Sequence, residues 1–139
     1  GETELMRPIH IKCHGFDAMR IAINKRDTIA RGRIIKCAKW RAAQEELAMM
    51  IRAERHPIIA EPVELGIVFT CARRSKCGLG FGDVDAPVKA IMDALVHGGV
   101  LTDDVIVGSV TSRKVLEDGS GPWLSIYLRE FFDVDEVPF

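Results

Sequence analysis

The most informative stretch of this sequence is Gly82-Asp-Val-Asp-Ala-Pro-Val-Lys-Ala-Ile-Met-Asp-Ala-Leu-Val-His-Gly-Gly-Val-Leu-Thr-Asp-Asp104. Asp85 is a favourable N-cap, Pro87 suits the first turn of a helix, and Gly98-Gly99 is a common helix end. The apolar residues between them recur at helical spacing and define one face, made of Val88, Ile91, Met92 and Leu95. The stretch therefore predicts an amphipathic helix between two acidic turns.

The charged residues of this stretch lie off that apolar face or just outside the helix. Lys89 and Asp93 are four residues apart, so their side chains share one side of the helix. Asp83 and Asp85 precede the helix, and Asp103-Asp104 follow it. Each feature alone is ordinary turn or surface chemistry. Together, however, these carboxylates would converge if the strands that flank the helix are neighbours.

Convergent carboxylates point to a bound cation, because they repel one another unless a positive charge neutralises them. Oxygen-only ligands suit Mg²⁺ or Mn²⁺ rather than zinc or copper. Such an ion activates water and holds a phosphodiester for in-line attack, and Lys89, one turn beyond Asp85, would stabilise charge on the phosphate. The sequence therefore predicts a Mg²⁺ site, at which Mn²⁺ can substitute, for phosphodiester chemistry.

The flanking segments predict a single α+β domain, in the order β-α-β-α-β-β, with a small mixed sheet packed against two helices. Residues 64–72 are almost continuously apolar, which indicates a central strand. Residues 16–35 show no clean period, and within them residues 24–27 and 30–33 are expected to form a mobile basic loop. The other expected elements are strands at 8–14, 105–115 and 123–129 and a helix at 39–55.

The composition is that of a globular protein: of 139 residues, 47% are hydrophobic and 28% are charged. No apolar run approaches the roughly 20 residues that cross a bilayer, and no signal-peptide pattern opens the chain, so we expect a cytoplasmic protein. We expect the domain to cover residues 8–131. It would lie between an N-terminal extension at 1–7, in part an expression remnant, and an acidic tail at 132–139.

Charge is unevenly distributed, although the net charge is only −1. Between residues 20 and 41 the chain has eight basic residues and a single acid, Asp27. Such a segment can present a positive face to a polyanion, or can simply be solvated surface.

The four cysteines, among them Cys37, are dispersed and are expected to be reduced thiols, because nothing marks the chain as secreted. No two of them have the C-x₂-C spacing of a zinc site, so Cys71 and Cys77 are best interpreted as small buried hydrophobes. The zinc alternative would draw its ligands from His10, Cys13, His14, Cys71 and Cys77.

The pattern Asp83-Val-Asp85-x-x-x-Lys89-Ala-x-x-Asp93-Ala-Leu95, followed by Asp103-Asp104, resembles the signature of the RusA family of Holliday junction resolvases. The resemblance extends more loosely to the whole chain, through the order of elements and the basic N-terminal segment. It implies a homodimeric, Mg²⁺-dependent endonuclease, often encoded by phages and prophages, that cuts four-way DNA junctions in recombination and repair. It implies neither a nucleotide cofactor nor a membrane partner.

The resemblance also assigns roles to individual residues. The metal-binding catalytic carboxylates would be Asp83, Asp85 and Asp104, the catalytic lysine would be Lys89, and further candidate ligands would be Asp93 and Asp103. Contacts to DNA phosphates are expected from Lys25, Arg26, Arg31, Arg33, Lys36, Lys39, Arg73, Arg74, Lys76, Arg113 and Lys114. Trp40 and Phe81 are candidates to stack on exposed bases, although the spacing of Trp40 favours the core.

The chain departs from the family pattern at Ala86, where asparagine is usual, and at the following Pro87. Other interpretations stay open: a branched-DNA binding protein of the same fold that does not cleave, a less selective DNA nuclease, and a transferase that holds a nucleotide diphosphate through metal. The acids and Lys89 favour a nuclease, and the chain is short for a transferase, with no second nucleotide-binding half.

Overall fold

The computed structural model describes residues 6–23, 27–30, 33–72 and 83–132. Its elements in chain order are β1 (Ile9–His14), the 3₁₀ helix η1 (Ala18–Ile21), β2 (Asp27–Ala30), β3 (Arg33–Lys36), α1 (Ala38–Ala53), β4 (Val63–Cys71), α2 (Val88–His97), the 3₁₀ helix η3 (Asp104–Ile106), β5 (Val107–Leu116) and β6 (Trp123–Glu130). The predicted α+β fold with a mixed sheet and two helices is confirmed. No helix within the described ranges is long and apolar enough to cross a membrane.

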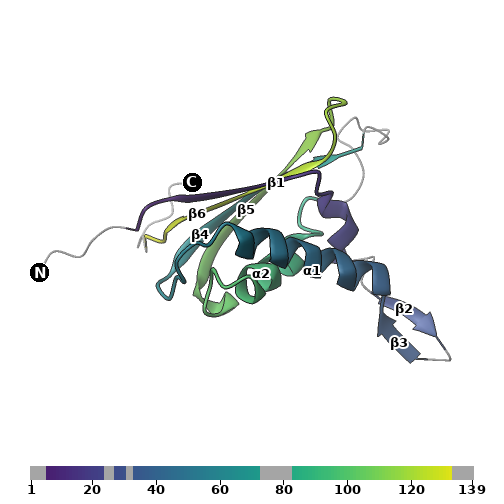
Figure 1. Cartoon of the computed structure of the whole chain (residues 1–139), viewed down its shortest axis with the longest axis horizontal. Helices are drawn as coiled ribbons and strands as arrows, with labels where there is room; N and C mark the ends of the chain where they lie inside the picture. Colours follow the sequence, from purple (N-terminus) through teal and green to yellow (C-terminus); the bar gives the residue numbers. More distant parts are fainter. Residues whose placement is uncertain (1–5, 24–26, 31–32, 73–82, 133–139) are drawn as a thin grey trace, which may run out of the picture.

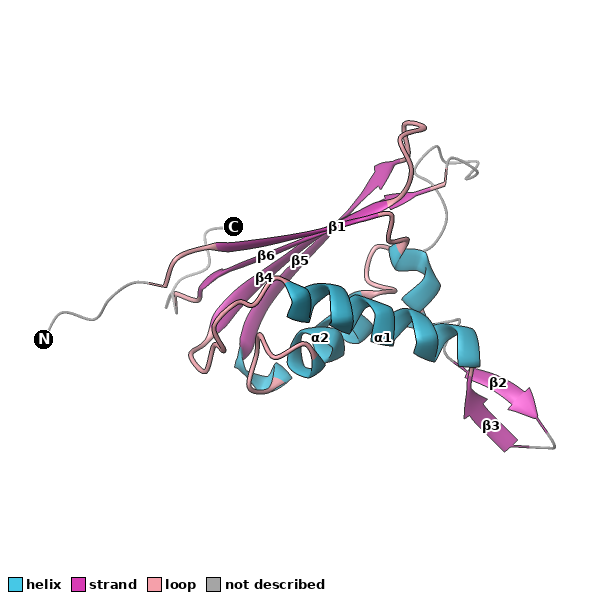
Figure 2. Ribbon diagram, viewed as in Figure 1, coloured by secondary structure: helices cyan, strands magenta, loops and turns pink. Residues whose placement is uncertain are grey.

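The main sheet has four strands in the order β1-β6-β4-β5. β6 runs antiparallel to both β1 and β4, whereas β4 and β5 are parallel. Parallel neighbours need a crossover connection, and α2 lies in that connection. Both α1 and α2 pack on the same face of the sheet, and no helix within the described ranges covers its other face (Figure 1, Figure 2).

The core lies between the sheet and the two helices. In β4 it takes alternate residues, since successive side chains of a strand point to opposite faces. Leu65, Ile67 and Phe69 are at most 1% exposed. Their neighbours in the core come from both helices and from β6, and include Leu47, Ile51, Ile91, Leu95, Leu124 and Ile126. Trp40 is also buried there, as its spacing predicted, which leaves it unavailable to stack on a base.

Two glycines end α2 for different reasons. A Cβ at Gly98 would lie 2.8 Å from Cγ2 of Ile51 on α1, so only glycine lets the two helices approach this closely. Gly99 has φ +79°, in the left-handed region that favours glycine. The predicted helix end at this pair is therefore confirmed.

Residues 16–35 contain regular elements that their lack of period did not predict, whereas residues 24–26 and 31–32 of the expected mobile loop lie outside the described residues. Asp17 accepts a hydrogen bond from the Met19 N–H (2.9 Å) and caps η1, and β2 pairs with β3 as an antiparallel hairpin that projects beyond α1 (Figure 1). The register sets Thr28 opposite Ile35 and Ile29 opposite Ile34. β-Branched residues favour such pairing, and this signal outweighs the high charge of the segment.

Candidate functional site

Lys89 joins two of the predicted site carboxylates. It lies in the first turn of α2, and its Nζ is 2.5 Å from Oδ2 of Asp104 and 3.3 Å from Oδ1 of Asp93. Asp93 lies one turn further along the same helix, as its spacing predicted, whereas Asp104 opens η3. The structure therefore brings a lysine and two aspartates from two elements into one exposed cluster.

The charges of this cluster stabilise one another. The hydrogen bonds that the Lys89 ammonium donates to Asp104 and then to Asp93 raise the pKa of Lys89 above its ordinary value. The hydrogen bond from Lys89, followed by one involving Asp103, lowers the pKa of Asp104. Both groups are solvent-exposed, so the arrangement fixes charge and position rather than adding much stability. At neutral pH the raised pKa of Lys89 keeps it an ammonium and the lowered pKa of Asp104 keeps it a carboxylate.

Asp103 has a structural function. Its Oδ1 accepts a hydrogen bond of 3.1 Å from the Val105 N–H, which caps η3. This cap fixes the start of η3 and so orients the adjacent Asp104 toward α2. Asp103 is better described as the residue that positions Asp104 than as an equal ligand.

The other two carboxylates, Asp83 and Asp85, are exposed in the turn that leads into α2. The prediction that Asp85 caps α2 is wrong, because the N-cap position is Pro87 and no side chain caps the helix. The turn is held through backbone bonds instead: the Val88 N–H donates to the Asp85 carbonyl at 3.1 Å. No described residue donates a hydrogen bond to the carboxylate of Asp83 or Asp85, so their oxygens remain open to a ligand.

Two contacts hold this turn against the rest of the domain. The Ser112 hydroxyl of β5 donates to the Val84 carbonyl at 2.6 Å, and the Ile23 N–H donates to the Ala86 carbonyl at 2.8 Å. The Ala86 side chain is 7% exposed and packs in the core. Sequence reasoning missed Ser112, since a serine in a strand carries no signal of a long-range contact.

The expected convergence of the aspartates is met in part. β4 and β5 are neighbours, which is the condition that the convergence required, but they are parallel, so the end of β4 and the start of β5 lie at opposite ends of the strands. The Ser112 contact places the turn with Asp83 and Asp85 along β5. Across the described residues, no three His, Cys, Asp or Glu side chains are close enough together to hold a metal ion.

The donor set nevertheless suits Mg²⁺ in kind. Asp83, Asp85 and Asp104 offer only carboxylate oxygens, each reachable from solvent, and hard cations of this type prefer such ligands. Oδ2 of Asp104 forms an ion pair with Lys89. The ammonium group of Lys89 therefore lies beside the carboxylate that a metal ion would need. The assignment of these three residues as metal ligands stays a prediction.

The predicted DNA contacts are only partly within the described residues. Lys39 is exposed in the first turn of α1, and Arg113 and Lys114 are adjacent on β5, so their side chains point to opposite faces of the sheet. Arg33 and Lys36 lie on β3, of which the structure describes the backbone. Outside the described residues lie Lys25, Arg26, Arg31, Arg73, Arg74, Lys76 and the stacking candidate Phe81.

The cysteines do not form the alternative zinc site among the described residues. Cys13 and Cys71 are buried, Cys37 is half-buried, and all three are thiols rather than half of a disulfide. His10 and His14 lie on the uncovered face of the sheet, whereas Cys13, between them, faces the core. Cys77 lies outside the described residues.

Comparison with known proteins shows the family of the chain. The sequence model of one family, Endodeoxyribonuclease RusA, matches residues 19–127. The match runs from η1 into β6 and includes every residue of the candidate site. Comparison with curated individual proteins gives no significant match. Because the family match covers most of the domain, the chain belongs to the RusA family of endodeoxyribonucleases.

Proposed function

We propose that this chain is a Mg²⁺-dependent endonuclease that resolves Holliday junctions by paired cuts, working as a homodimer. The observation that carries the proposal is the contact of Lys89 with Asp104 and Asp93, within a chain of an endodeoxyribonuclease family. A lysine held between two carboxylates at the surface, with two further exposed aspartates in the turn before its helix, suits a phosphodiester that meets both a cation and an ammonium.

In this proposal Asp83, Asp85 and Asp104 hold the metal ion, which when bound activates water and neutralises phosphate charge. Asp103 keeps Asp104 in place through its cap on η3. Lys89 donates to a phosphate oxygen or to the leaving oxygen, and Asp93 holds its ammonium on the correct side of α2. Asp93 is thus a positioning residue rather than a ligand.

The substrate and assembly follow from the same chemistry. The basic residues around β2 and β3, with Lys39, would contact phosphates, which confers affinity and salt dependence but little base specificity. Selectivity would then come from the shape of the junction. A junction is nearly two-fold symmetric, and two matched cuts need two active sites, which a C2 dimer supplies.

The test is cleavage of a synthetic four-way junction with and without Mg²⁺, alongside a linear duplex of the same sequence. We expect symmetric cuts that need the metal, and junction binding without cutting by Asp85→Asn. Asp118→Asn is the matched control, since it makes the same change at an exposed aspartate in the β5–β6 connection, where the carboxylate accepts hydrogen bonds from Ser120. The control should cut normally.

Each alternative predicts a different result. If the wild-type protein binds the junction but never cuts it in Mg²⁺ or Mn²⁺, the chain is a branched-DNA binding protein. Equal cutting of the linear duplex would identify a less selective nuclease. Undiminished cutting by Asp85→Asn would refute the assigned metal site.

A further inference from the structure

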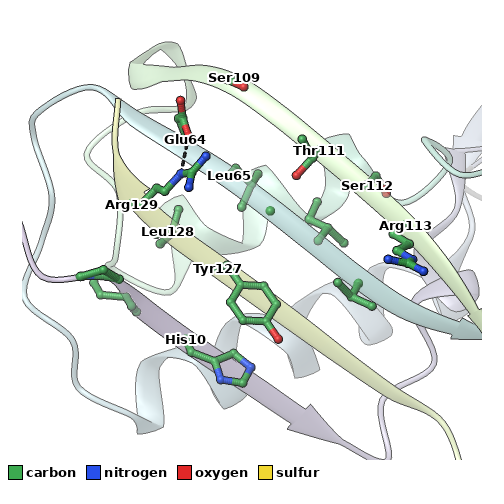
Figure 3. Close-up of a pocket in the computed structure, with 15 residues that line it drawn as sticks. His10, Glu64, Leu65, Ser109, Thr111, Ser112, Arg113, Tyr127, Leu128 and Arg129 are labelled. Carbon is green, nitrogen blue, oxygen red and sulfur yellow. Dashed lines mark hydrogen bonds and ion pairs between the residues drawn. The ribbon is translucent and has the colours of Figure 1, made fainter. Parts of the chain in front are cut away.

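Successive residues of β5 face opposite sides of the sheet. Thr111 and Arg113 line a hollow of about 730 Å³ on the face that no described helix covers (Figure 3). Ser112 lies between them and is the register partner of Ile67, whose side chain is buried in the core on the helix side. Because register partners share a face of the sheet and successive residues alternate, the Ser112 side chain is directed to the helix side.

The Ser112 hydroxyl contacts the turn that holds two of the predicted site carboxylates. It donates to the Val84 carbonyl at 2.6 Å, and Val84 is the residue between Asp83 and Asp85. A peptide unit is planar, so a hydrogen bond to this carbonyl also fixes the orientation of the Asp85 N–H and Cα. Ser112 therefore sets the piece of backbone from which the Asp85 carboxylate projects.

This contact ties the turn to β5. Within the described residues, the other hydrogen bonds of the turn join backbone atoms: the Ala86 N–H donates to the Asp83 carbonyl, and the Ile23 N–H donates to the Ala86 carbonyl. Neither of these bonds involves β5. The Val84 side chain is 41% exposed, so packing alone holds this part of the turn weakly.

β5 also leads back to the third predicted metal ligand. The 3₁₀ helix η3 begins with Asp104 and runs directly into β5 at Val107. Asp104 and Ser112 therefore belong to one continuous segment, and from Val107 to Leu116 that segment pairs with the central strand β4. A strand held by such a ladder is among the stiffer parts of a domain. The turn and Asp104, the two halves of the proposed metal site, are thus joined through Ser112.

We infer that Ser112 is a positioning residue of the metal site, which sets where Asp83 and Asp85 lie relative to Asp104. The inference rests on the proposed function, since it concerns the ligands of the proposed Mg²⁺ ion. Mg²⁺ demands near-ideal octahedral geometry, so a ligand whose backbone is loosely held weakens binding of the ion. Groups that orient metal ligands typically change metal affinity by about 10–100-fold. Ser112 acts through the backbone of the turn rather than on the ion.

Three substitutions separate the hydroxyl from the shape of the side chain. Ser112→Ala and Ser112→Val remove the hydroxyl, whereas Ser112→Thr keeps it and has nearly the same shape as Ser112→Val. By calorimetry we expect the first two variants to bind Mn²⁺ about tenfold more weakly than the wild type, and Ser112→Thr to bind it within about twofold. Thr111→Val is the matched control, since it removes a hydroxyl from the adjacent residue, which lines the hollow, and should bind Mn²⁺ normally. Melting temperatures check that each variant is folded.

Cleavage and backbone dynamics provide two further readouts. Ser112→Val should cut a four-way junction more slowly than the wild type at limiting Mg²⁺ and approach the wild-type rate at saturating Mg²⁺, because its ligands are displaced rather than removed. Without metal, the NMR order parameters of the Val84 and Asp85 amides should fall in Ser112→Val but not in Ser112→Thr. A residue that served only the stability of the sheet would change neither of these quantities.

The outcomes also separate this inference from the proposed function. Wild-type Mn²⁺ affinity in Ser112→Ala and Ser112→Val, or equal weakening in Ser112→Thr and Ser112→Val, would overturn the inference even if the wild type cuts junctions. A wild type that binds Mn²⁺ but cuts no junction would refute the proposed function alone, and the Mn²⁺ affinities of the variants would still decide the inference. A wild type that binds no Mn²⁺ would overturn both.

Discussion

The two faces of the central sheet use the same strands in opposite ways. In β4 the residues that face the helices, such as Ile67 and Phe69, are large, apolar and fully buried. The alternate residues border an open hollow: Glu64 is charged, Gly66 has no side chain and Val68 is small. One face is used for folding and the other is left available for contact.

The candidate active site belongs to neither face. Its carboxylates and Lys89 come from a turn, the first two turns of α2 and η3, all on the edge of the helix side. Charged groups that must stay in water cannot be taken from a close-packed core. The core instead fixes the positions of α2 and β5, and the charged side chains lie on the solvent-exposed parts of α2 and just before β5.

The largest effect should follow from truncation on the covered face. Phe69→Ala removes a ring that is fully buried, and we expect it to lower the free energy of unfolding by about 3–5 kcal/mol, because a cavity is left behind. Val68→Ala, the adjacent residue on the other face, should cost about 1 kcal/mol or less. Urea unfolding at low protein concentration measures both. Equal losses would show that the two faces are not different in the isolated chain.

Sequence reasoning could predict most of the fold because its signals are local. The apolar run of β4 and the period of α1 follow from burial on one or two faces, and both elements were placed within two residues of their observed limits. The β2–β3 hairpin was missed because charge was given more weight than the β-branched residues beside it. The uncovered face could not be foreseen, since strand order is a property of the whole chain.

The site could be predicted in residue type but not in arrangement. The spacing of Lys89 and Asp93 fixes their contact, because both lie on one helix. The contact of Lys89 with Asp104 instead depends on how the chain turns after Gly99, and on the cap that Asp103 gives η3. The failure of Asp85 as an N-cap has a local cause, because Pro87 takes that position.

Within the site, the two partners of Lys89 should differ. Asp104→Asn removes a proposed metal ligand, and we expect junction cutting to fall by about 10²–10³-fold. Asp93→Asn removes only the group that positions Lys89, and a loss of about tenfold is expected. Single-turnover cleavage separates the two, and melting temperatures should stay near that of the wild type. Equal losses would contradict the distinct roles given to the two carboxylates.

Removal of the ammonium itself should change the pKa of a neighbouring carboxyl. Lys89→Gln takes away the main cause of the low pKa of Asp104, so that pKa should rise toward its ordinary value. In the wild type the ionised carboxylate persists as pH falls below the usual Asp range, and the charged pair is lost only as pH passes the depressed pKa. NMR titration of the Asp104 carboxyl should show the upward shift.

The same variant should alter metal binding. With Lys89 gone, Oδ2 of Asp104 no longer holds an ammonium, so Mn²⁺ affinity measured by calorimetry should stay the same or increase while cutting decreases. Lys12→Gln is the matched control, since Lys12 lies over Trp123, on another part of the sheet. A weaker Mn²⁺ affinity in Lys89→Gln alone would mean that the lysine helps to build the metal site.

The smallest effect is expected in a test that changes no residue and compares the reactivity of two thiols. Burial raises the pKa of Cys13, on the covered face of β1, to about 11, whereas N–H groups of Trp40 and Lys39 lower the pKa of Cys37. At pH 8 a maleimide should therefore label Cys37 quickly and Cys13 only on unfolding, as peptide mass spectrometry would show. The neutral Cys13 thiol also contributes stability that is complete below the ordinary thiol pKa of 9.0 and is lost as pH rises toward 11. Rapid labelling of Cys13 in the folded protein would mean that the covered face opens, and the contrast between the two faces would then be one of degree.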